Sequence, residues 1–313
     1  MLVALDGSEP SLIGRDLVAD LPWPESTTIH LVTAYHVPVD WTGGFGATMS
    51  WVGDFEDQVR DELRDRLREM AEPLAALGLT VRRHVVRGRA ASAIVEAAED
   101  LGVDLVVLGS RGHSPLRSML LGSVATEVAA DAHCAVLVAR ESSVSHLLVA
   151  TDGSDTARGI PGLLTTWGIF ERMPADVVSV LVPDPAALGL FTGLYTLGDE
   201  RMSRMHRELE ERQRAVLEQA TGDLAAAGLA PTPRAATGDP TREILSAAEA
   251  CAADLIVTGS RGLHGLERIL IGSVARNVLM HARCSVLVMR PARAAAASTP
   301  ESPQQGAQID EGS

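Results

Sequence analysis

One glycine pattern occurs twice in this chain of 313 residues, and its chemistry suits phosphate binding. The spacing is G-x2-G-x9-G-S, beginning once at Gly109 and again at Gly259. Each copy directly follows an apolar run of strand length, 105–108 and 255–258. Glycine lets backbone N–H groups approach an anion without obstruction from a Cβ atom. The repeated spacing therefore indicates two phosphate-binding loops and a tandem duplication.

Within each loop, we expect the glycines, an arginine and the serine that opens the next helix to contact phosphate. The start of a helix offers unpaired amides and the positive end of its dipole, which both favour an anion. The serine can instead cap its helix, the arginine can be solvated, and the glycines can serve only tight turns and close packing. The residues of this set are Gly109, Arg111, Gly112, Gly122 and Ser123 in the first copy and Gly259, Arg261, Gly262, Gly272 and Ser273 in the second.

The two copies align over most of their length, which predicts two domains of the same fold. Gly88 and Cys134 are each matched by a like residue 150 positions later, at Gly238 and Cys284. Alternating strands and helices predict an α/β fold class with two tandem, doubly wound, five-stranded parallel sheets of Rossmann-like type. We expect a first domain over 1–140, a polar linker over 141–145, a second domain over 146–291 and a disordered tail over 292–313.

Apolar periodicity gives the expected position of each element. In the first copy we expect strands near 1–5, 27–35, 79–86, 103–108 and 134–139 and helices near 9–20, 53–77, 90–101 and 122–131. In the second copy we expect strands near 146–151, 176–182, 231–236, 253–258 and 284–289 and helices near 155–169, 199–227, 240–251 and 272–281. Pro73 predicts a break or kink late in the first long helix.

Composition excludes several classes of function. The formal net charge is −14, which disfavours nucleic acid as a partner. All 27 basic residues are Arg, so a Walker A lysine and Schiff-base chemistry are excluded. The apolar runs are too short to span a membrane, and Met1 leads directly into a strand rather than a signal peptide. We therefore expect a cytoplasmic protein without a membrane partner.

The three cysteines, Cys134, Cys251 and Cys284, do not form a recognisable set. Their number is odd and no C-x-x-C pair occurs, so the sequence suggests neither a zinc site nor a disulfide framework. A reducing cytoplasm fits this usage. Nor does any Ser-His-Asp order or H-E-x-x-H helix occur, so the sequence does not predict a fast enzyme.

Further motifs lie at the two ends of each copy. The first strand ends in Asp-Gly-Ser, at Asp6 and at Asp152, and the last strand begins at a cysteine, Cys134 or Cys284. With the glycine pattern, these motifs make both halves resemble the universal stress protein family, specifically its ATP-binding class, up to about residue 291. The resemblance implies Rossmann-like domains of the adenine nucleotide alpha hydrolase type.

The resemblance also implies a ligand and its contacts. It implies that each copy binds ATP, with Asp6 and Asp152 beside the nucleotide and adenine against the second strand near Ala34 and Val180. A carboxylate at this place can accept ribose hydroxyl bonds or help to hold Mg²⁺, and it can alternatively cap the first helix. The family commonly pairs its last strand across a dimer interface, which implies intramolecular pairing of the two copies here and leaves a further homodimer open.

Our leading hypothesis is a nucleotide-dependent sensor or regulator of a stress response. Two alternatives remain: a slow Mg²⁺-dependent ATPase or phosphotransferase, and a scaffold whose glycines are purely structural. Pro240 starts a helix well where the first copy has Ala90, which makes the second site the stronger candidate. The pattern does not distinguish ATP from AMP, and it identifies neither the triggering stress nor a protein partner.

Overall fold

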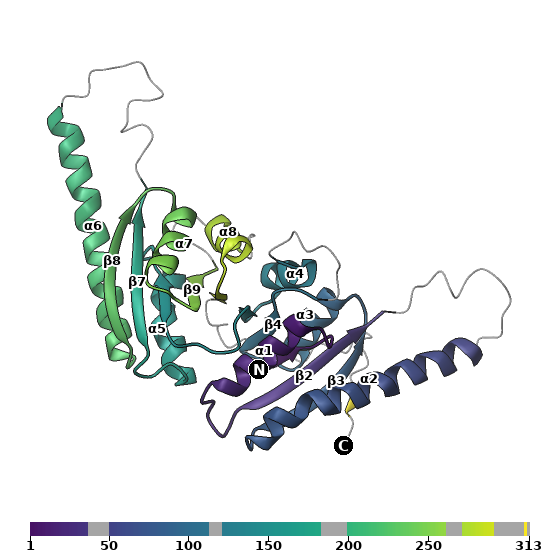
Figure 1. Ribbon diagram of the computed structural model, residues 1–313. Helices are drawn as coiled ribbons and strands as arrows, with labels where there is room; N and C mark the ends of the chain where they lie inside the picture. The colour runs from purple at the N-terminus through teal and green to yellow at the C-terminus, as the bar shows by residue number, and fades with distance from the viewer. Residues whose placement is uncertain (37–49, 113–120, 183–198, 261–270, 291–309, 312–313) are drawn as a thin grey trace, which may run out of the picture. The chain divides into compact units, whose positions relative to one another are not determined.

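The computed structural model describes residues 1–36, 50–112, 121–182, 199–260, 271–290 and 310–311. The chain divides into two compact units, which Figure 1 shows as ribbons. The first unit consists of Met1–Ser143 with Ala292–Ser313, and the second consists of Val144–Pro291.

The first unit is built around a five-stranded parallel sheet. Its strands are β1 (Leu2–Ala4), β2 (Thr28–Tyr35), β3 (Thr80–Arg87), β4 (Leu105–Gly109) and β5 (Ala135–Ala139), in the order β3-β2-β1-β4-β5. Its helices are α1 (Glu9–Asp20), α2 (Ser50–Ala76), α3 (Ala90–Asp100) and α4 (Ser123–Asp131). The short strand β11 (Asp310–Glu311) pairs antiparallel with β3.

The second unit repeats this arrangement. Its strands are β6 (Leu147–Ala150), β7 (Pro174–Leu181), β8 (Ala230–Thr237), β9 (Leu255–Gly259) and β10 (Ser285–Met289), in the order β8-β7-β6-β9-β10 and all parallel. Its helices are α5 (Asp155–Trp167), α6 (Asp199–Ala226), α7 (Pro240–Ala250) and α8 (Ser273–His281). The predicted fold class, two tandem doubly wound sheets, is confirmed.

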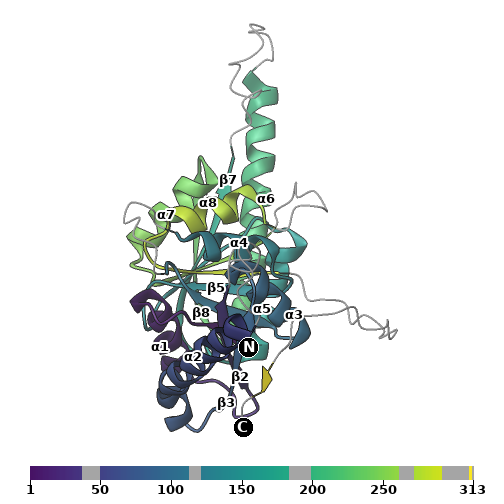
Figure 2. The ribbon, with the colours of Figure 1, turned by 90° about the vertical axis from the view of Figure 1, so that its right-hand side faces the viewer.

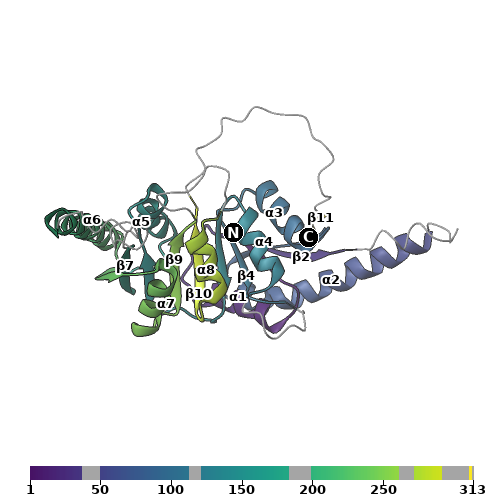
Figure 3. The same ribbon diagram turned by 90° about the horizontal axis from the view of Figure 1, so that it is seen from above.

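Helices cover both faces of each sheet. In the first unit α1 packs beside α2 and α3 packs beside α4, and Figure 3 shows these pairs on opposite faces of the sheet. In the second unit α5 contacts α6, and α7 lies beside α8 (Figure 2). Strands covered on both faces should be apolar throughout. Accordingly, every residue of β1, β5, β6 and β10 is buried.

The strand order also determines where a ligand can enter. In each unit the order reverses beside the first strand, between β1 and β4 and between β6 and β9. Open α/β sheets bind ligands at the carboxyl ends of the strands beside such a reversal. Both glycine patterns begin there, because Gly109 and Gly259 are the last residues of β4 and β9.

Of the break or kink expected at Pro73, the structure contradicts the break. Helix α2 continues through Pro73 and ends at Ala76 rather than breaking at the proline. A proline removes the hydrogen bond to the carbonyl four residues earlier, which is a limited loss this close to a helix end. Burial compensates for that loss, because Leu74 in the following position is fully buried. Among the described residues, no helix has both the length and the apolarity needed to cross a membrane.

Candidate functional site

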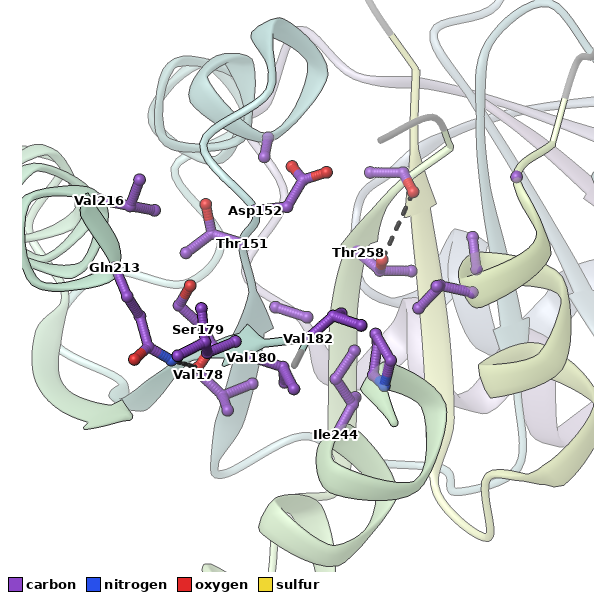
Figure 4. A pocket seen from close by; sticks show the side chains of 18 of the residues that line it. Thr151, Asp152, Val178, Ser179, Val180, Val182, Gln213, Val216, Ile244 and Thr258 are labelled. Atoms are coloured by element: carbon purple, nitrogen blue, oxygen red, sulfur yellow. Dashed lines mark hydrogen bonds between the residues drawn. The ribbon is translucent and has the colours of Figure 1, made fainter. Parts of the chain in front are cut away.

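A pocket of about 620 Å³ lies at the carboxyl edge of the second unit's sheet (Figure 4). Small-molecule sites commonly enclose about 300–1,000 Å³, so this volume suits a ligand of ordinary size. The ends of β6, β7 and β9 contribute to its wall, together with α6, α7 and the first turn of α8. The pocket thus occupies the place where the strand order reverses.

Asp152 lies at the end of β6 and lines this pocket. Gly153 turns the chain with a φ of +73°, and the Asp152 carboxylate then accepts the N–H of Ser154 at 2.9 Å. The N-cap of α5 is Ser154 itself, whose hydroxyl accepts the N–H of Ala157. The expected alternative, in which the aspartate caps the first helix, is therefore wrong: Asp152 holds the capping serine, and Asp6 holds Ser8 in the same way.

The glycine pattern forms the opposite, polar wall of the pocket. Gly259, Ser260, Gly272 and Ser273 all line it, and the Gly272 N–H donates to the Ser260 carbonyl at 2.6 Å. The Ser260 side chain is fully buried, and its hydroxyl has no hydrogen-bond partner among the described residues. Buried hydroxyl groups in folded proteins are nearly always hydrogen-bonded, and a ligand in the pocket can supply the partner for this one.

The start of α8 faces the same pocket. Its N-cap is Gly272, which has no side chain of its own, and no other described residue is seen to cap the helix. The expected alternative in which Ser273 or Ser123 caps its helix is wrong, because each serine is the first helical residue after a glycine N-cap. The uncapped amides and the positive helix end are therefore available to an anion.

A third wall is apolar. Val178, Val180 and Ile244 line it, and Val182 adds a valine that is 54% exposed. Strand β7 is longer than β6: the last residue of β7 paired with β6 is Val178, opposite Ala150. The backbone of the next β7 residues, including Val180, therefore extends past β6 along the pocket.

Helix α6 closes the pocket with polar side chains that the sequence analysis missed. Gln213 donates from Nε2 to the carbonyls of Ser179 and Ala236, at 2.7 and 2.8 Å, and so fixes α6 against β7 and β8. Arg212 lines the pocket and is exposed. Among the described residues, it forms neither an ion pair nor a hydrogen bond. Both residues lie in the charged sequence of α6, which gives no local signal that would have identified either of them.

The first unit brings its predicted residues together in the same order. The Asp6 Oδ1 atom accepts both the N–H and the hydroxyl of Ser8, at 2.9 and 2.6 Å. Its Oδ2 lies so close to Gly112 that a Cβ there would approach it to 2.5 Å. The Gly122 N–H donates to the Ser110 carbonyl at 2.8 Å, which matches the Gly272 contact.

At Gly109 the structure shows close packing, which is the alternative role that the sequence left open for these glycines. A Cβ at this position would overlap the carbonyl group of Pro10, so Gly109 allows α1 to pack directly on the end of β4. Gly14 permits the same approach one turn later, since its Cα faces the backbone of Leu108. The residue equivalent to Gly14 in the second unit is Ile160, which is fully buried.

The remaining predicted residues have less defined places. Arg111 is exposed beside Gly112, and Ser123 is exposed at the start of α4. Ala34 is half-buried in β2, paired with Val86 of β3. Arg261 and Gly262 lie outside the described residues.

Sequence comparisons place both units in one family. The model of the universal stress protein family matches residues 1–140 and again 144–290. Universal stress protein YxiE of Bacillus subtilis is 31% identical over 144 residues, covering 45% of this chain and 97% of that protein. Universal stress protein Rv2623 of Mycobacterium tuberculosis is 28% identical over 220 residues, covering 67% of this chain and 69% of the relative.

Solved structures agree on the fold of the whole chain. A universal stress protein from Archaeoglobus fulgidus superimposes with a TM-score of 0.60 at 21% identity, covering 93% of this chain and 95% of the other. One from Pseudomonas aeruginosa gives a TM-score of 0.61 at 17% identity, covering 93% and 92%. With two family matches that together span nearly the whole sequence, the chain belongs to the universal stress protein family and is a tandem member of it.

Proposed function

We propose that this tandem universal stress protein binds ATP and that its second unit holds the stronger site. The observation that carries the proposal is the pocket of about 620 Å³ in that unit. Five positions chosen from the sequence for nucleotide contact line it: Asp152, Val180, Gly259, Gly272 and Ser273. This coincidence of the sequence pattern with the cavity supports the proposal.

The shape and chemistry of the pocket fit a nucleotide. Val178, Val180, Val182 and Ile244 would cover the faces of an adenine ring, and the β7 backbone would reach its edge. The uncapped start of α8, the Ser260 hydroxyl and the Arg212 guanidinium would bind phosphate oxygens. Asp152 would accept the ribose hydroxyls or share Mg²⁺ with the phosphates.

The first unit should bind ATP more weakly. The carbonyl of Pro10 lies against Gly109, where a phosphate needs a donor rather than an acceptor. Helix α2 carries Glu62 at the position that corresponds to Arg212 in α6. Glu62 distinguishes the first unit, because it carries a negative charge where the second unit has a guanidinium. The Pro10 carbonyl adds a negative dipole beside Gly109, which also disfavours an anion there.

We infer that ATP occupancy is the signal by which the protein acts in a cytoplasmic stress response, through a protein partner. This role rests on membership of the family. The competing proposal is a scaffold with structural glycines, and the close packing at Gly109 favours it for the first unit. The scaffold proposal predicts that neither unit binds ATP.

A pair of matched variants tests the proposal. Gly272→Asp places a carboxylate at the N-cap of α8, where Asp is a favourable residue, so the variant should fold and melt at or above the wild-type temperature. The same carboxylate occupies the anion position and repels phosphate. Calorimetric titration with Mg-ATP should therefore show a loss of at least about 100-fold in affinity, corresponding to about 2.7 kcal/mol.

The control is Gly122→Asp, which makes the same change at the start of α4, where the atoms nearest to a Cβ lie 3.4 Å away. This variant should retain the tight site. If folded Gly272→Asp bound ATP as tightly as the wild type, the assignment to the second unit would be wrong. If the wild type bound none, the scaffold would become the better explanation.

A further inference from the structure

A second group of reactive side chains lies at the opposite edge of the second unit's sheet, away from the pocket. His146 immediately precedes β6, Asp176 is the third residue of β7, and Cys251 is the C-cap of α7. One ring nitrogen, one carboxylate oxygen and the Sγ atom of these residues all lie within 4.8 Å of one another. Three separate segments thus converge on one point.

The group is held in place by its surroundings. The Nε2 atom of His146 lies 2.7 Å from Oδ2 of Asp176, and Arg234 of β8 donates from Nε to Oδ1 of the same carboxylate. Asp254 accepts the backbone N–H of His146 at 3.0 Å, which fixes the chain just before β6. Asp176 itself is only 4% exposed. These contacts on both oxygens hold the buried Asp176 carboxylate in one orientation.

We propose that His146, Asp176 and Cys251 bind a zinc ion. Imidazole nitrogen, carboxylate oxygen and thiolate sulfur are the ligand types that Zn²⁺ takes, and three protein ligands leave a fourth position for water. Bonds of about 2.0–2.3 Å place tetrahedral ligand atoms roughly 3.3–3.6 Å apart. The present separation of 2.7 Å for the His146–Asp176 pair must therefore widen by less than about 1 Å, which side-chain rotation can provide.

Arg234 has a defined part in this site. It would remain on Oδ1 while the metal took Oδ2, so that the ligating carboxylate keeps an outer hydrogen bond, as metal ligands commonly do. Its positive charge already balances Asp176. With Cys251 as thiolate and His146 as neutral imidazole, the loaded site would carry a net charge of about +1, a modest charge at a half-buried position.

Zinc binding at this site requires the Cys251 thiol to lose its proton. Burial raises the pKa of the Cys251 thiol, the negative charge of Asp176 raises it further, and Arg234 opposes this rise. The thiol is therefore protonated in the metal-free protein at neutral pH, and zinc must displace that proton to solvent as the Zn–S bond forms.

The first unit offers an internal comparison. The positions equivalent to Asp176, Arg234 and Cys251 are His30, His84 and Leu101, so the first unit has neither the carboxylate nor the thiol at these places. The ligand set is thus particular to the second unit. The sequence alone does not reveal this ligand set, because its three residues lie in distant segments of the chain.

The alternative explanation is an ion-pair network of His146, Asp176 and Arg234 with an incidental thiol nearby. Untagged, metal-free protein distinguishes the two when it is titrated with Zn²⁺ by calorimetry and with Co²⁺ by absorption spectroscopy, both without nucleotide. We expect one tight ion per chain, release of at least one proton, and a thiolate-to-cobalt charge-transfer band.

Ligand variants locate the ion. Cys251→Ala and His146→Ala should each lower the zinc affinity by at least about 100-fold, and Cys251→Ala should abolish the charge-transfer band. Cys284→Ala, which removes a cysteine outside the cluster, should change neither. The proposal is overturned if the wild type binds no tight zinc, if Cys251→Ala binds zinc as the wild type does, or if the cobalt complex lacks the thiolate band. Circular dichroism confirms that each variant is folded.

Discussion

Arg212 and Glu62 occupy equivalent positions in the two long helices, and their charges are opposite. Arg212 lines the second unit's pocket, whereas Glu62 is exposed on α2 and accepts a hydrogen bond from Arg66 at 2.5 Å. A guanidinium at the mouth of a pocket attracts an anion, and a carboxylate repels it. A single side chain thus distinguishes the two units as anion sites.

Replacing Arg212 should weaken ATP binding without weakening the fold. A hydrogen bond to a charged group contributes about 1.5–3 kcal/mol, so Arg212→Gln should lower ATP affinity by about tenfold or more. Calorimetry measures the change, and Arg214→Gln is the control, because Arg214 is exposed on the same helix outside the pocket lining. Equal affinities for the two variants would remove Arg212 from the site.

Gly109 should be required for stability. In Gly109→Ala the new Cβ would overlap the backbone of Pro10, which cannot move without displacing α1. Overpacking of this kind costs roughly 1–3 kcal/mol, which urea unfolding can measure. The matched control is Gly53→Ala in α2, where nothing lies within 4 Å and alanine favours the helix. A Gly109→Ala protein as stable as that control would contradict the packing role.

At the scale of elements, the two strands at one side of each sheet, β2 with β3 and β7 with β8, differ between the units. His30 of β2 and His84 of β3 are buried, with His30 Nδ1 3.0 Å from His84 Nε2 and the rings stacked. The equivalent positions on β7 and β8 hold Asp176 and Arg234. There, burial disfavours the charged carboxylate, but the hydrogen bonds and charges of Arg234 and His146 outweigh it and lower the pKa of Asp176.

The histidine pair should make the first unit sensitive to acid. Burial, together with the nearby His84, amino terminus and Arg82, lowers the pKa of His30 to about 4. The unfolded chain therefore binds more protons between about pH 6.5 and 4, so the stabilisation is complete above pH 6.5 and is lost as the pH falls to 4. The shift corresponds to roughly 3 kcal/mol.

Urea unfolding between pH 7.5 and 4 measures this loss. His30→Leu with His84→Leu removes both titrating rings, and carboxylates contribute equally to both proteins, so the difference between the two pH profiles isolates the pair. We expect the double variant to lose less stability on acidification. Parallel profiles would show that the pair does not titrate as described.

The elements themselves were predictable because their signals are local. Apolar runs and glycines located all ten parallel strands within a few residues, and the repeat supplied each prediction twice. The break expected at Pro73 does not occur. Helix propensity describes an isolated helix, whereas the burial of Leu74 stabilises this helix in the folded protein. For the site, spacing identified the glycines and Asp152. It could not identify Arg212, Gln213 or Ile244, whose positions depend on how helices pack against the sheet.

At the scale of the whole molecule, the two copies have the same fold but differ in the side chains around their equivalent sites. Both units have the same strand order, the same Asp-Gly-Ser turn and the same glycine spacing. The two units differ at the positions of Gly14, Glu62, His30 and Leu101, so the surroundings of their equivalent sites differ as well. We interpret the chain as a protein with one stronger nucleotide site and one unit that has diverged from it.

A crystal structure of the protein grown with Mg-ATP tests this interpretation most directly. The concentration should be one that saturates binding in solution. We predict density for the nucleotide in the second unit, with the base against Val180 and the phosphates at the start of α8 beside Gly272 and Ser273. A second unit without nucleotide under these conditions, or ATP bound elsewhere on the chain, would contradict the central claim.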